Sequence, residues 1–289
     1  MRDVNWDGAV NARDLGGLPT PLGPIQPGRL YRSARPEYLT ERGCQDLVDA
    51  GVTTIIDLRN ADERSAVRRI DGVTIHHLPI EDPTDAAFMA EWGERLDSPA
   101  YYSDALRRWP DRITALFAHV LEVDVGGLLI HCSGGCDRTG MVVAMLLAAV
   151  GTPVAAILDD YELAVRTMNT HAAQLGEAAL SWASLDRHCA LARDDLVAFL
   201  ESADPAAYFT SGQMDGLRER LTTFDWQGLG LAAGCRNLWP GSPPALCTRT
   251  SGDHLREGRH PLAVLGFAEG GEFLVRHRHP VRFLAQGMQ

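Results

Sequence analysis

One short segment of the sequence places a candidate nucleophile next to residues that bind anions. Residues 127–131 are mostly apolar and predict a buried strand that leads directly to Cys132. Arg138 follows at the start of a predicted helix, and Gly134 and Gly135 lie between them. Free N–H groups and the dipole at a helix N-terminus attract an anion. The glycines let the loop curl closely around a phosphate, because side chains would obstruct that approach.

Each residue of this loop has an expected role in phosphate chemistry. Arg138 offers a planar fork that binds two phosphate oxygens at once. The positive field favours the thiolate of Cys132, which is then placed for in-line attack and a phosphocysteine intermediate. We expect Thr139 to donate its hydroxyl toward the sulfur and His131 to support the loop from behind. No metal or other cofactor is required, because the arginine and the amides carry the charge. The expected phosphate cradle consists of Ser133, Gly134, Gly135, Cys136 and Arg138.

Other interpretations of the same loop are less favoured. A zinc site built from His131, Cys132 and Cys136 lacks the usual two-residue gap between ligands, and no partner pair is evident. Cys132 and Cys136 are close enough in sequence to form a protective disulfide on a curled loop. We favour the alternative that Cys136 is a small apolar filler that points away.

Four motifs occur in order along the chain. They are Asn11-Ala12-Arg13-Asp14-Leu15-Gly16-Gly17, Leu30-Tyr31-Arg32-Ser33, Ile56-Asp57-Leu58-Arg59 and His131-Cys132-x5-Arg138-Thr139. This set resembles the cysteine-dependent protein tyrosine phosphatases, and most closely a bacterial branch of that superfamily, over roughly residues 5–225. Asp160-Tyr161 is a further feature of the branch. The resemblance implies a tyrosine phosphatase α/β fold with a helical lid. It also implies phosphotyrosine substrates, with phosphoserine, phosphothreonine or phosphoinositides in some members.

The identity of the general acid is open between two aspartates. A tyrosyl oxygen leaves more easily when it is protonated, so a carboxylic acid should lie above the phosphate. The resemblance favours Asp137 inside the loop, and Asp82, after a predicted strand, is the alternative. Arg13, Asp14 and Arg59 are expected to line or brace the rim. Equally, Arg13 and Asp14 could form a structural salt bridge that anchors the Gly16-Gly17 turn.

One position departs from the branch. Its members usually have lysine just before the loop aspartate, where this sequence has Cys136. All 27 basic residues of the chain are arginine, so composition alone would have replaced that lysine by arginine. Loss of the cation should weaken the binding of multiply phosphorylated ligands such as phosphoinositides.

The elements that must position these residues alternate along the chain. Strands are predicted over residues 30–32, 52–58, 73–80 and 127–131. Helices are predicted after the N-cap Thr40, over 61–69, in two or three pieces over 85–122, over 138–150, from Thr152-Pro153 to about 200, and over 211–221. This order predicts a mostly parallel central sheet flanked by helices. We divide the chain into a tyrosine phosphatase domain, 1–227, and a tail, 228–289, in which 262–267 and 272–276 could pair as a hairpin.

The length, net charge and apolar runs of the chain limit which kinds of molecule it is expected to bind. With 289 residues and a net charge of −11, the chain has no general basic surface for nucleic acid, so any phosphate site must be locally positive. The start lacks the apolar core of a signal peptide, and the longest apolar run, residues 141–150, is too short to span a bilayer. We therefore expect a cytoplasmic protein, although export without a signal peptide leaves no trace in a sequence.

These observations predict a protein tyrosine phosphatase, with dual specificity as a variant. The expected substrates are phosphotyrosine-containing proteins or small phosphomonoesters. Sulfurtransferases and arsenate reductases also place a cysteine in an anion-binding loop, but they normally lack the Arg138-Thr139 ending or need further redox cysteines. A catalytically dead phosphate-binding module would lack Cys132 or Arg138, and both are present. Phosphoinositide phosphatase activity is a further alternative.

Overall fold

The computed structural model describes residues 2–64, 69–123, 126–223, 264–267 and 273–276. The chain forms two compact units, Met1–Phe224 and Asp225–Gln289. The first unit contains a five-stranded sheet and the helices around it, and the second contains a two-stranded sheet. No helix in the described ranges is both long and apolar enough to cross a membrane.

The large sheet is mostly parallel, as the alternation of strands and helices predicted. Its strands are β1 (Arg13–Asp14), β2 (Leu30–Ser33), β3 (Val52–Asp57), β4 (Thr74–His77) and β5 (Gly127–His131). They lie in the order β1-β2-β5-β3-β4, and only β1 runs antiparallel to its neighbour. His131, the last residue of β5, pairs with Ser33 on one side and Asp57 on the other. The carboxyl ends of three central strands therefore meet where the loop begins.

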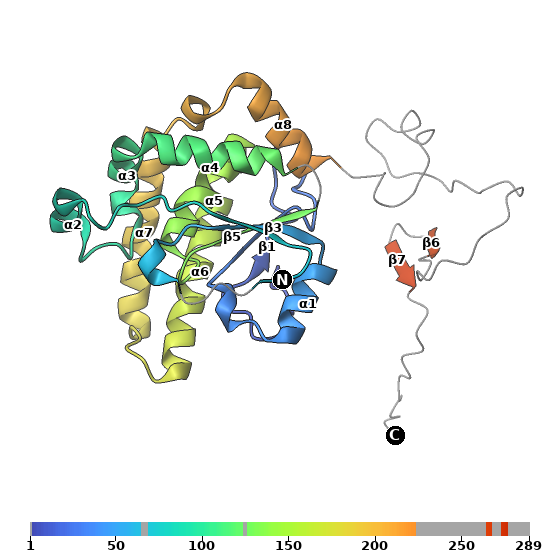
Figure 1. The fold of residues 1–289 in the computed structure, drawn as a ribbon, viewed down its shortest axis with the longest axis horizontal. Helices are drawn as coiled ribbons and strands as arrows, with labels where there is room; N and C mark the ends of the chain where they lie inside the picture. Colours follow the sequence, from blue (N-terminus) through green and yellow to red (C-terminus); the bar gives the residue numbers. More distant parts are fainter. Residues whose placement is uncertain (1, 65–68, 124–125, 224–263, 268–272, 277–289) are drawn as a thin grey trace, which may run out of the picture. The chain divides into compact units, whose positions relative to one another are not determined.

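Helices cover both faces of this sheet (Figure 1). They are α1 (Glu41–Asp49), α2 (Ala86–Trp92), α3 (Tyr102–Arg108), α4 (Pro110–Glu122), α5 (Asp137–Ala149), α6 (Val154–Leu175), α7 (Trp182–Ser202) and α8 (Ser211–Thr222). Short 3-10 turns add η1 (Pro36–Tyr38), η2 (Ala61–Glu63), η3 (Pro99–Tyr101) and η4 (Pro205–Tyr208). Figure 1 shows α1 below the sheet and α4 and α8 above it, with α6 and α7 side by side.

Two hydrophobic cores follow from the alternation of side chains along the buried strands. Ile56 of β3 and Ile130 of β5 face the larger core, which includes α4, α5 and α7. Ile55 and Leu129 point to the opposite face and pack with Leu47 of α1. Because successive residues face opposite helical layers, the middle of each central strand is apolar on both faces, Ile55-Ile56 in β3 and Leu128-Leu129-Ile130 in β5, as expected for parallel strands covered on both sides.

The predicted helix over residues 61–69 is wrong in its first part. Ala61–Glu63 forms a single 3-10 turn, and Arg64 is already extended with φ −97° and ψ 116°. The turn closes because the Asn60 N–H donates to the Glu63 carboxylate at 3.0 Å. Glu63 is thereby turned toward the strand ends, and residues 65–68 lie outside the described ranges. The predicted strand over 73–80 is also shorter, Thr74–His77.

The second unit contains the hairpin predicted in the tail. β6 (Val264–Phe267) pairs antiparallel with β7 (Phe273–Arg276), which confirms that pairing. The other residues of the 228–289 tail lie outside the described ranges.

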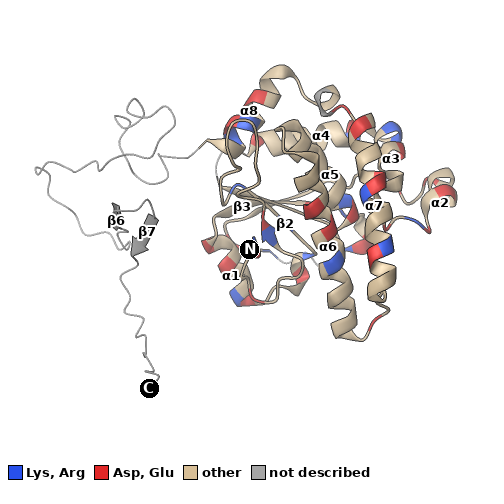
Figure 2. Cartoon of the chain, turned by 180° about the vertical axis from the view of Figure 1, so that it is seen from behind, with Lys and Arg blue, Asp and Glu red and all other residues tan. Residues whose placement is uncertain are grey.

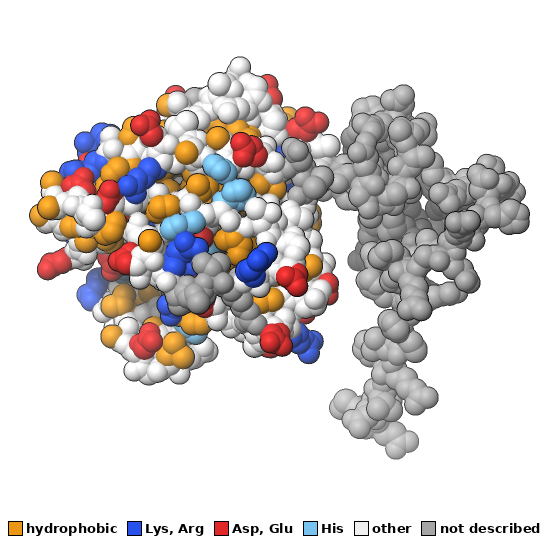
Figure 3. Space-filling view, in the orientation of Figure 1, with side chains coloured by type: hydrophobic (Ala, Val, Ile, Leu, Met, Phe, Trp, Pro, Cys, Tyr) orange, Lys and Arg blue, Asp and Glu red, His pale blue; other side chains and the backbone are white. Residues whose placement is uncertain are grey.

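Charged residues are interspersed on the first unit. Figure 2 shows both acidic and basic residues on α1, α3 and α7, and no broad basic face in that view. Histidine side chains gather near the centre of the face drawn in Figure 3. Among the histidines of the edge strand β4 and the neighbouring α4, the rings of His76 and His119 lie 5.0 Å apart. The mixture of acidic and basic residues agrees with the expectation that any anion-binding site is confined to a small, locally positive region.

Candidate active site

The loop after β5 begins with a nearly buried cysteine. Cys132 has 4% of its surface exposed, and α5 begins five residues later at Asp137. Gly135 has a positive φ of 68°, and a Cβ at this position would collide with the backbone oxygen of Ser33. Gly135 is therefore required by its conformation and by its packing. Gly134 is not restricted in this way, since its Cβ would only touch Met168 at 3.7 Å.

His131 supports the loop from inside the protein. Its side chain is buried, and its Nδ1 lies 3.1 Å from the Cys132 carbonyl oxygen, to which it donates as Nδ1–H. Burial lowers the pKa of His131, so the ring is neutral at pH 7. Its Nε2 lies 3.7 Å from the carboxylate of Asp57 at the end of β3. Asp57 in turn binds Arg59, with Nε to Oδ1 at 2.9 Å.

Asn11 connects the N-terminal motif to the loop. Its amide donates to the Gly134 carbonyl at 2.9 Å and lies 3.6 Å from the Cys136 sulfur. Its carbonyl oxygen accepts a hydrogen bond of 2.9 Å from Arg13. Asn11 has a φ of 51°, the one positive value at a non-glycine residue in the described chain. A left-handed backbone is uncommon for such residues, and here it aims the amide at the loop.

A buried ion-pair cluster lies behind the loop. Asp160 of α6 accepts hydrogen bonds from Arg13 Nε at 2.9 Å and Arg32 Nη1 at 2.6 Å. The other nitrogen of the Arg32 fork donates to the Gly135 carbonyl at 2.6 Å. Burial alone would raise the pKa of Asp160, but the charges of Arg32 and Arg13 hold it far below its usual range. The cluster fixes the loop from below.

Two rim residues proposed from the sequence lie in the interior. Arg13 and Arg59 are 1% and 3% exposed, so they brace the site and do not line its rim. The alternative of an Arg13–Asp14 salt bridge is wrong, because Arg13 pairs with Asp160. Asp14 instead accepts 2.8 Å hydrogen bonds from the N–H groups of Gly16 and Gly28, which anchors the glycine turn.

The Arg138 guanidinium is held by a glutamate that the sequence reasoning missed. Both terminal nitrogens of Arg138 donate to Glu63, and Nη2 lies 2.6 Å from Oε1. Ser133 Oγ also donates to Glu63 Oε1, at 2.9 Å. Burial would raise the pKa of Glu63, but its hydrogen bond with Arg138 and its other partners lower it to about 2. A second missed residue, the buried Glu81, lies 3.7 Å from Arg138 Nε.

Asp137 occupies a setting that suits a proton donor. Burial raises its pKa from the usual value to about 7. The Tyr161 hydroxyl donates to its Oδ1 at 2.8 Å, and the Tyr102 hydroxyl donates to its backbone oxygen at 2.7 Å. The carboxyl group is therefore oriented and partly protonated near neutral pH.

Asp82, the alternative acid, is engaged elsewhere. It accepts hydrogen bonds from the Thr84 N–H and hydroxyl at 3.0 and 2.6 Å, and pairs with Arg112 at 2.9 Å. The hydrogen bonds from Thr84 lower its pKa, so it is ionised at neutral pH. An ionised carboxylate has no proton to give to a leaving group.

The remaining loop residues are placed as follows. Thr139 is buried, and its hydroxyl has no hydrogen-bond partner within the described residues, so the expected bond to the Cys132 sulfur is not formed.

Both Cys132 and Cys136 are free thiols, and burial raises the pKa of Cys136 well above its usual value. The described ranges contain no group of three or more His, Cys, Asp or Glu side chains that could hold a metal ion.

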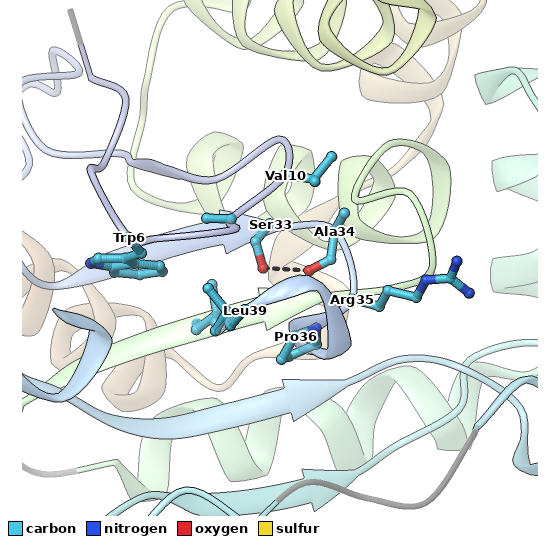
Figure 4. A pocket seen from close by; sticks show the side chains of 9 residues that line it. Trp6, Val10, Ser33, Ala34, Arg35, Pro36 and Leu39 are labelled. Atoms are coloured by element: carbon cyan, nitrogen blue, oxygen red, sulfur yellow. Dashed lines mark hydrogen bonds between the residues drawn. The ribbon is translucent and has the colours of Figure 1, made fainter. Parts of the chain in front are cut away.

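A pocket lies next to the loop, at the turn from β2 into η1 (Figure 4). It is lined on one side by Trp6 and Leu39 and on the other by Ser33, whose hydroxyl donates to the Ala34 carbonyl at 2.7 Å. No residue of 132–138 lines it, so it is distinct from the phosphate loop. Figure 4 shows the Arg35 side chain pointing away from Trp6 and Leu39.

Comparison with known proteins agrees with this geometry. The sequence model described as "Tyrosine phosphatase family" matches residues 4–220. The chain is 31% identical over 188 residues to "Putative tyrosine-protein phosphatase H16_A0669" of Cupriavidus necator, an alignment that covers 62% of this chain and 67% of that protein. It is 35% identical over 185 residues to "Triple specificity protein phosphatase PtpB" of Mycobacterium tuberculosis, covering 53% of this chain and 66% of the relative, slightly less than two thirds.

Among solved structures, TpbA of P. aeruginosa aligns with 72% of this chain and 89% of its own. The sequence identity is 21% and the TM-score is 0.34, so this similarity adds nothing to the family match.

Proposed function

The chain belongs to the tyrosine phosphatase family, and we propose that it hydrolyses phosphotyrosine in proteins through a phosphocysteine intermediate on Cys132. Membership of the family makes the chain a hydrolase of phosphorylated substrates. The specific proposal rests most directly on one observation. Asp137 lies directly before Arg138, five residues after Cys132, and the Tyr161 hydroxyl orients its carboxyl group at 2.8 Å while burial raises its pKa to about 7.

In the first step, the Cys132 thiolate attacks phosphorus in line with the tyrosyl oxygen. The S–P bond forms as the P–O bond to the tyrosine breaks, and Asp137 gives its proton to the departing oxygen. The backbone N–H groups of the loop and the Arg138 fork bind the phosphoryl oxygens, on which charge accumulates in the transition state. Glu63 positions that fork through both terminal nitrogens.

In the second step, water attacks the phosphocysteine. The now ionised Asp137 takes a proton from this water, the S–P bond breaks, and inorganic phosphate leaves while Cys132 returns to the thiolate. Asp137 therefore acts first as an acid and then as a base, and the step needs no further reactant. A carboxyl group with a pKa near the working pH serves both directions of proton transfer.

We propose a narrow range of phosphomonoesters. The relative from M. tuberculosis is named as a triple specificity phosphatase. In this chain Cys136 occupies the position where the branch usually has lysine, and burial keeps its thiol uncharged. Arg138 is then the one cation within residues 132–138. We expect poor turnover of phosphoinositides, whose additional phosphates would lack a partner in the loop.

The experiment is an assay on a phosphotyrosine peptide with a metal chelator present. We expect turnover by the wild type, inhibition by vanadate, and loss of activity in Cys132→Ser. The control is Cys189→Ser, which changes another buried free thiol, on α7 and outside the loop, and should retain activity. Dependence on added metal, or activity that persists in Cys132→Ser, would refute the proposal.

A further inference from the structure

A second cation lies directly beside the phosphate loop. The backbone N–H of Arg35 donates to the Ser133 carbonyl at 3.1 Å, so the two residues are fixed to each other. Arg35 is exposed, in contrast to Arg32 three residues earlier. The following Pro36 begins η1 and restricts the backbone of Arg35, which has φ −53° and ψ 135°.

The guanidinium of Arg35 is oriented by aromatic neighbours. Its Nη2 donates to the Tyr38 hydroxyl at 2.8 Å, and its Cζ lies 4.7 Å from the centre of the Tyr38 ring. The Tyr38 ring contacts His171 of α6 edge-on, at 5.4 Å and 75°. One turn earlier on α6, Met168 lies against Gly134 of the loop. Arg35, Tyr38 and His171 thus form a row between η1 and α6 next to the loop.

Charge pairing distinguishes Arg35 from the other arginines around the loop. Arg13 and Arg32 share an ion pair with Asp160, which Arg2 also contacts. Arg59 pairs with Asp57 and Glu37, and Arg138 pairs with Glu63. In the described part of the chain, no carboxylate lies within ion-pair distance of Arg35. Within the described residues, Arg35 is therefore an exposed arginine beside the phosphate loop that has no carboxylate partner.

We propose that Arg35 binds a carboxylate next to the phosphotyrosine of a peptide substrate, so that acidic residues flanking the phosphotyrosine are preferred. This inference rests on the proposed phosphotyrosine activity. A guanidinium group can bind a carboxylate through two parallel hydrogen bonds, and packing on the Tyr38 ring fixes the orientation of the Arg35 guanidinium. A membrane surface fits less well, because anionic lipids are bound by clusters of several basic residues and the chain is strongly acidic overall.

The test compares two phosphotyrosine peptides that differ only in having Asp or Asn beside the phosphotyrosine. The readout is the ratio of kcat/KM for the acidic peptide to that for the neutral peptide. We expect a wild-type ratio of about 2- to 5-fold at low salt, as for an exposed ion pair, and a decline as salt is added. Arg35→Ala should bring the ratio to about one, and Arg35→Gln, which keeps a donor toward Tyr38, should do the same.

The matched control is Arg42→Ala, since Arg42 is an exposed arginine on α1 and should leave the ratio at the wild-type value. A wild-type ratio near one, or a ratio that Arg35→Ala leaves unchanged, would overturn the proposal. So would a loss in Arg35→Ala confined to phosphoinositide vesicles. If the wild type hydrolyses neither peptide nor p-nitrophenyl phosphate, the proposed phosphatase function itself fails. That result is distinct from a phosphatase without acidic preference.

Discussion

The Tyr161 hydroxyl donates a 2.8 Å hydrogen bond to the carboxylate of Asp137, which joins α6 to the first residue of α5. Two opposing effects act on this carboxyl group. Burial disfavours the charged form of the carboxyl group, whereas the hydrogen bond from Tyr161 favours the charged form. Burial is the larger effect, so the pKa of Asp137 rises to about 7. The aspartate that follows Cys136 therefore combines a fixed orientation with a proton to give near neutral pH.

Replacement of Asp137 by asparagine should separate its role from that of Asp82. We expect Asp137→Asn to lower kcat on a phosphotyrosine peptide by about 10²- to 10⁴-fold, because the leaving oxygen loses its proton donor. The loss should be smaller on p-nitrophenyl phosphate, whose leaving group needs less protonation. Asp82→Asn should retain most of the activity, since Asp82 is ionised and bound to Thr84 and Arg112. The reverse pattern would assign the acid to Asp82.

The pH profile should follow the same carboxyl group. The first step requires protonated Asp137, so kcat should fall as the pH rises through about 7. The Tyr161 hydrogen bond lowers this pKa, and Tyr161→Phe should therefore move the alkaline limb to higher pH. Profiles of kcat against pH for the two proteins and for Asp137→Asn measure this directly. An alkaline limb that survives unchanged in Asp137→Asn would show that another group controls it.

The sequence predicts the loop well because its parts are local. Cys132, Gly135 and Arg138 lie within one strand-loop-helix segment, where residue type and spacing largely determine the geometry. The sequence does not decide between Asp137 and Asp82 as the general acid, because only burial and hydrogen bonds distinguish them. Those depend on α6 and on Arg112 of α4, which sequence spacing does not place.

Residues that support the loop from far along the chain were harder to predict. Glu63 is 75 positions from Arg138, and Arg13 is 147 positions from Asp160. Glu63 reaches the loop because β3 lies next to β5, so the turn after β3 ends near Cys132. The pattern Asn60-x-x-Glu63 directly after a buried strand is the signal for this turn in the sequence, although residues 61–69 as a whole favour a helix. Only the order of the strands in the sheet shows that this turn lies beside Arg138, and spacing along the sequence does not give that order.

Glu63 offers a test of how Arg138 is held. We expect Glu63→Gln to lower kcat/KM on a phosphotyrosine peptide by about 10-fold or more, because the neutral amide cannot accept from both guanidinium nitrogens. The matched control is Asp62→Asn, an exposed carboxylate on the same turn. Steady-state kinetics of both variants measure the effect. A higher kcat/KM in Glu63→Gln would mean that Glu63 blocks the phosphate site and does not position Arg138.

The cluster around Asp160 should dominate the stability of the site. Asp160→Asn leaves the buried Arg13 and Arg32 without a counter-charge, which costs about 3–5 kcal/mol of unfolding free energy at pH 7. The folded-state pKa of Asp160 lies below the unfolded value, so its contribution is present above about pH 4 and is lost as the pH falls further. The difference between wild type and variant should therefore shrink in acid.

Urea unfolding of the two proteins at several pH values measures this difference. Asp159→Asn is the control, because its side chain is 70% exposed and pairs with Arg193 on the surface, so its unfolding midpoint should barely change. If Asp160→Asn unfolded at the wild-type midpoint at pH 7, the buried arginines would have another source of compensation. Because Arg32 also binds the Gly135 carbonyl, we expect destabilisation and loss of phosphatase activity to occur together in Asp160→Asn.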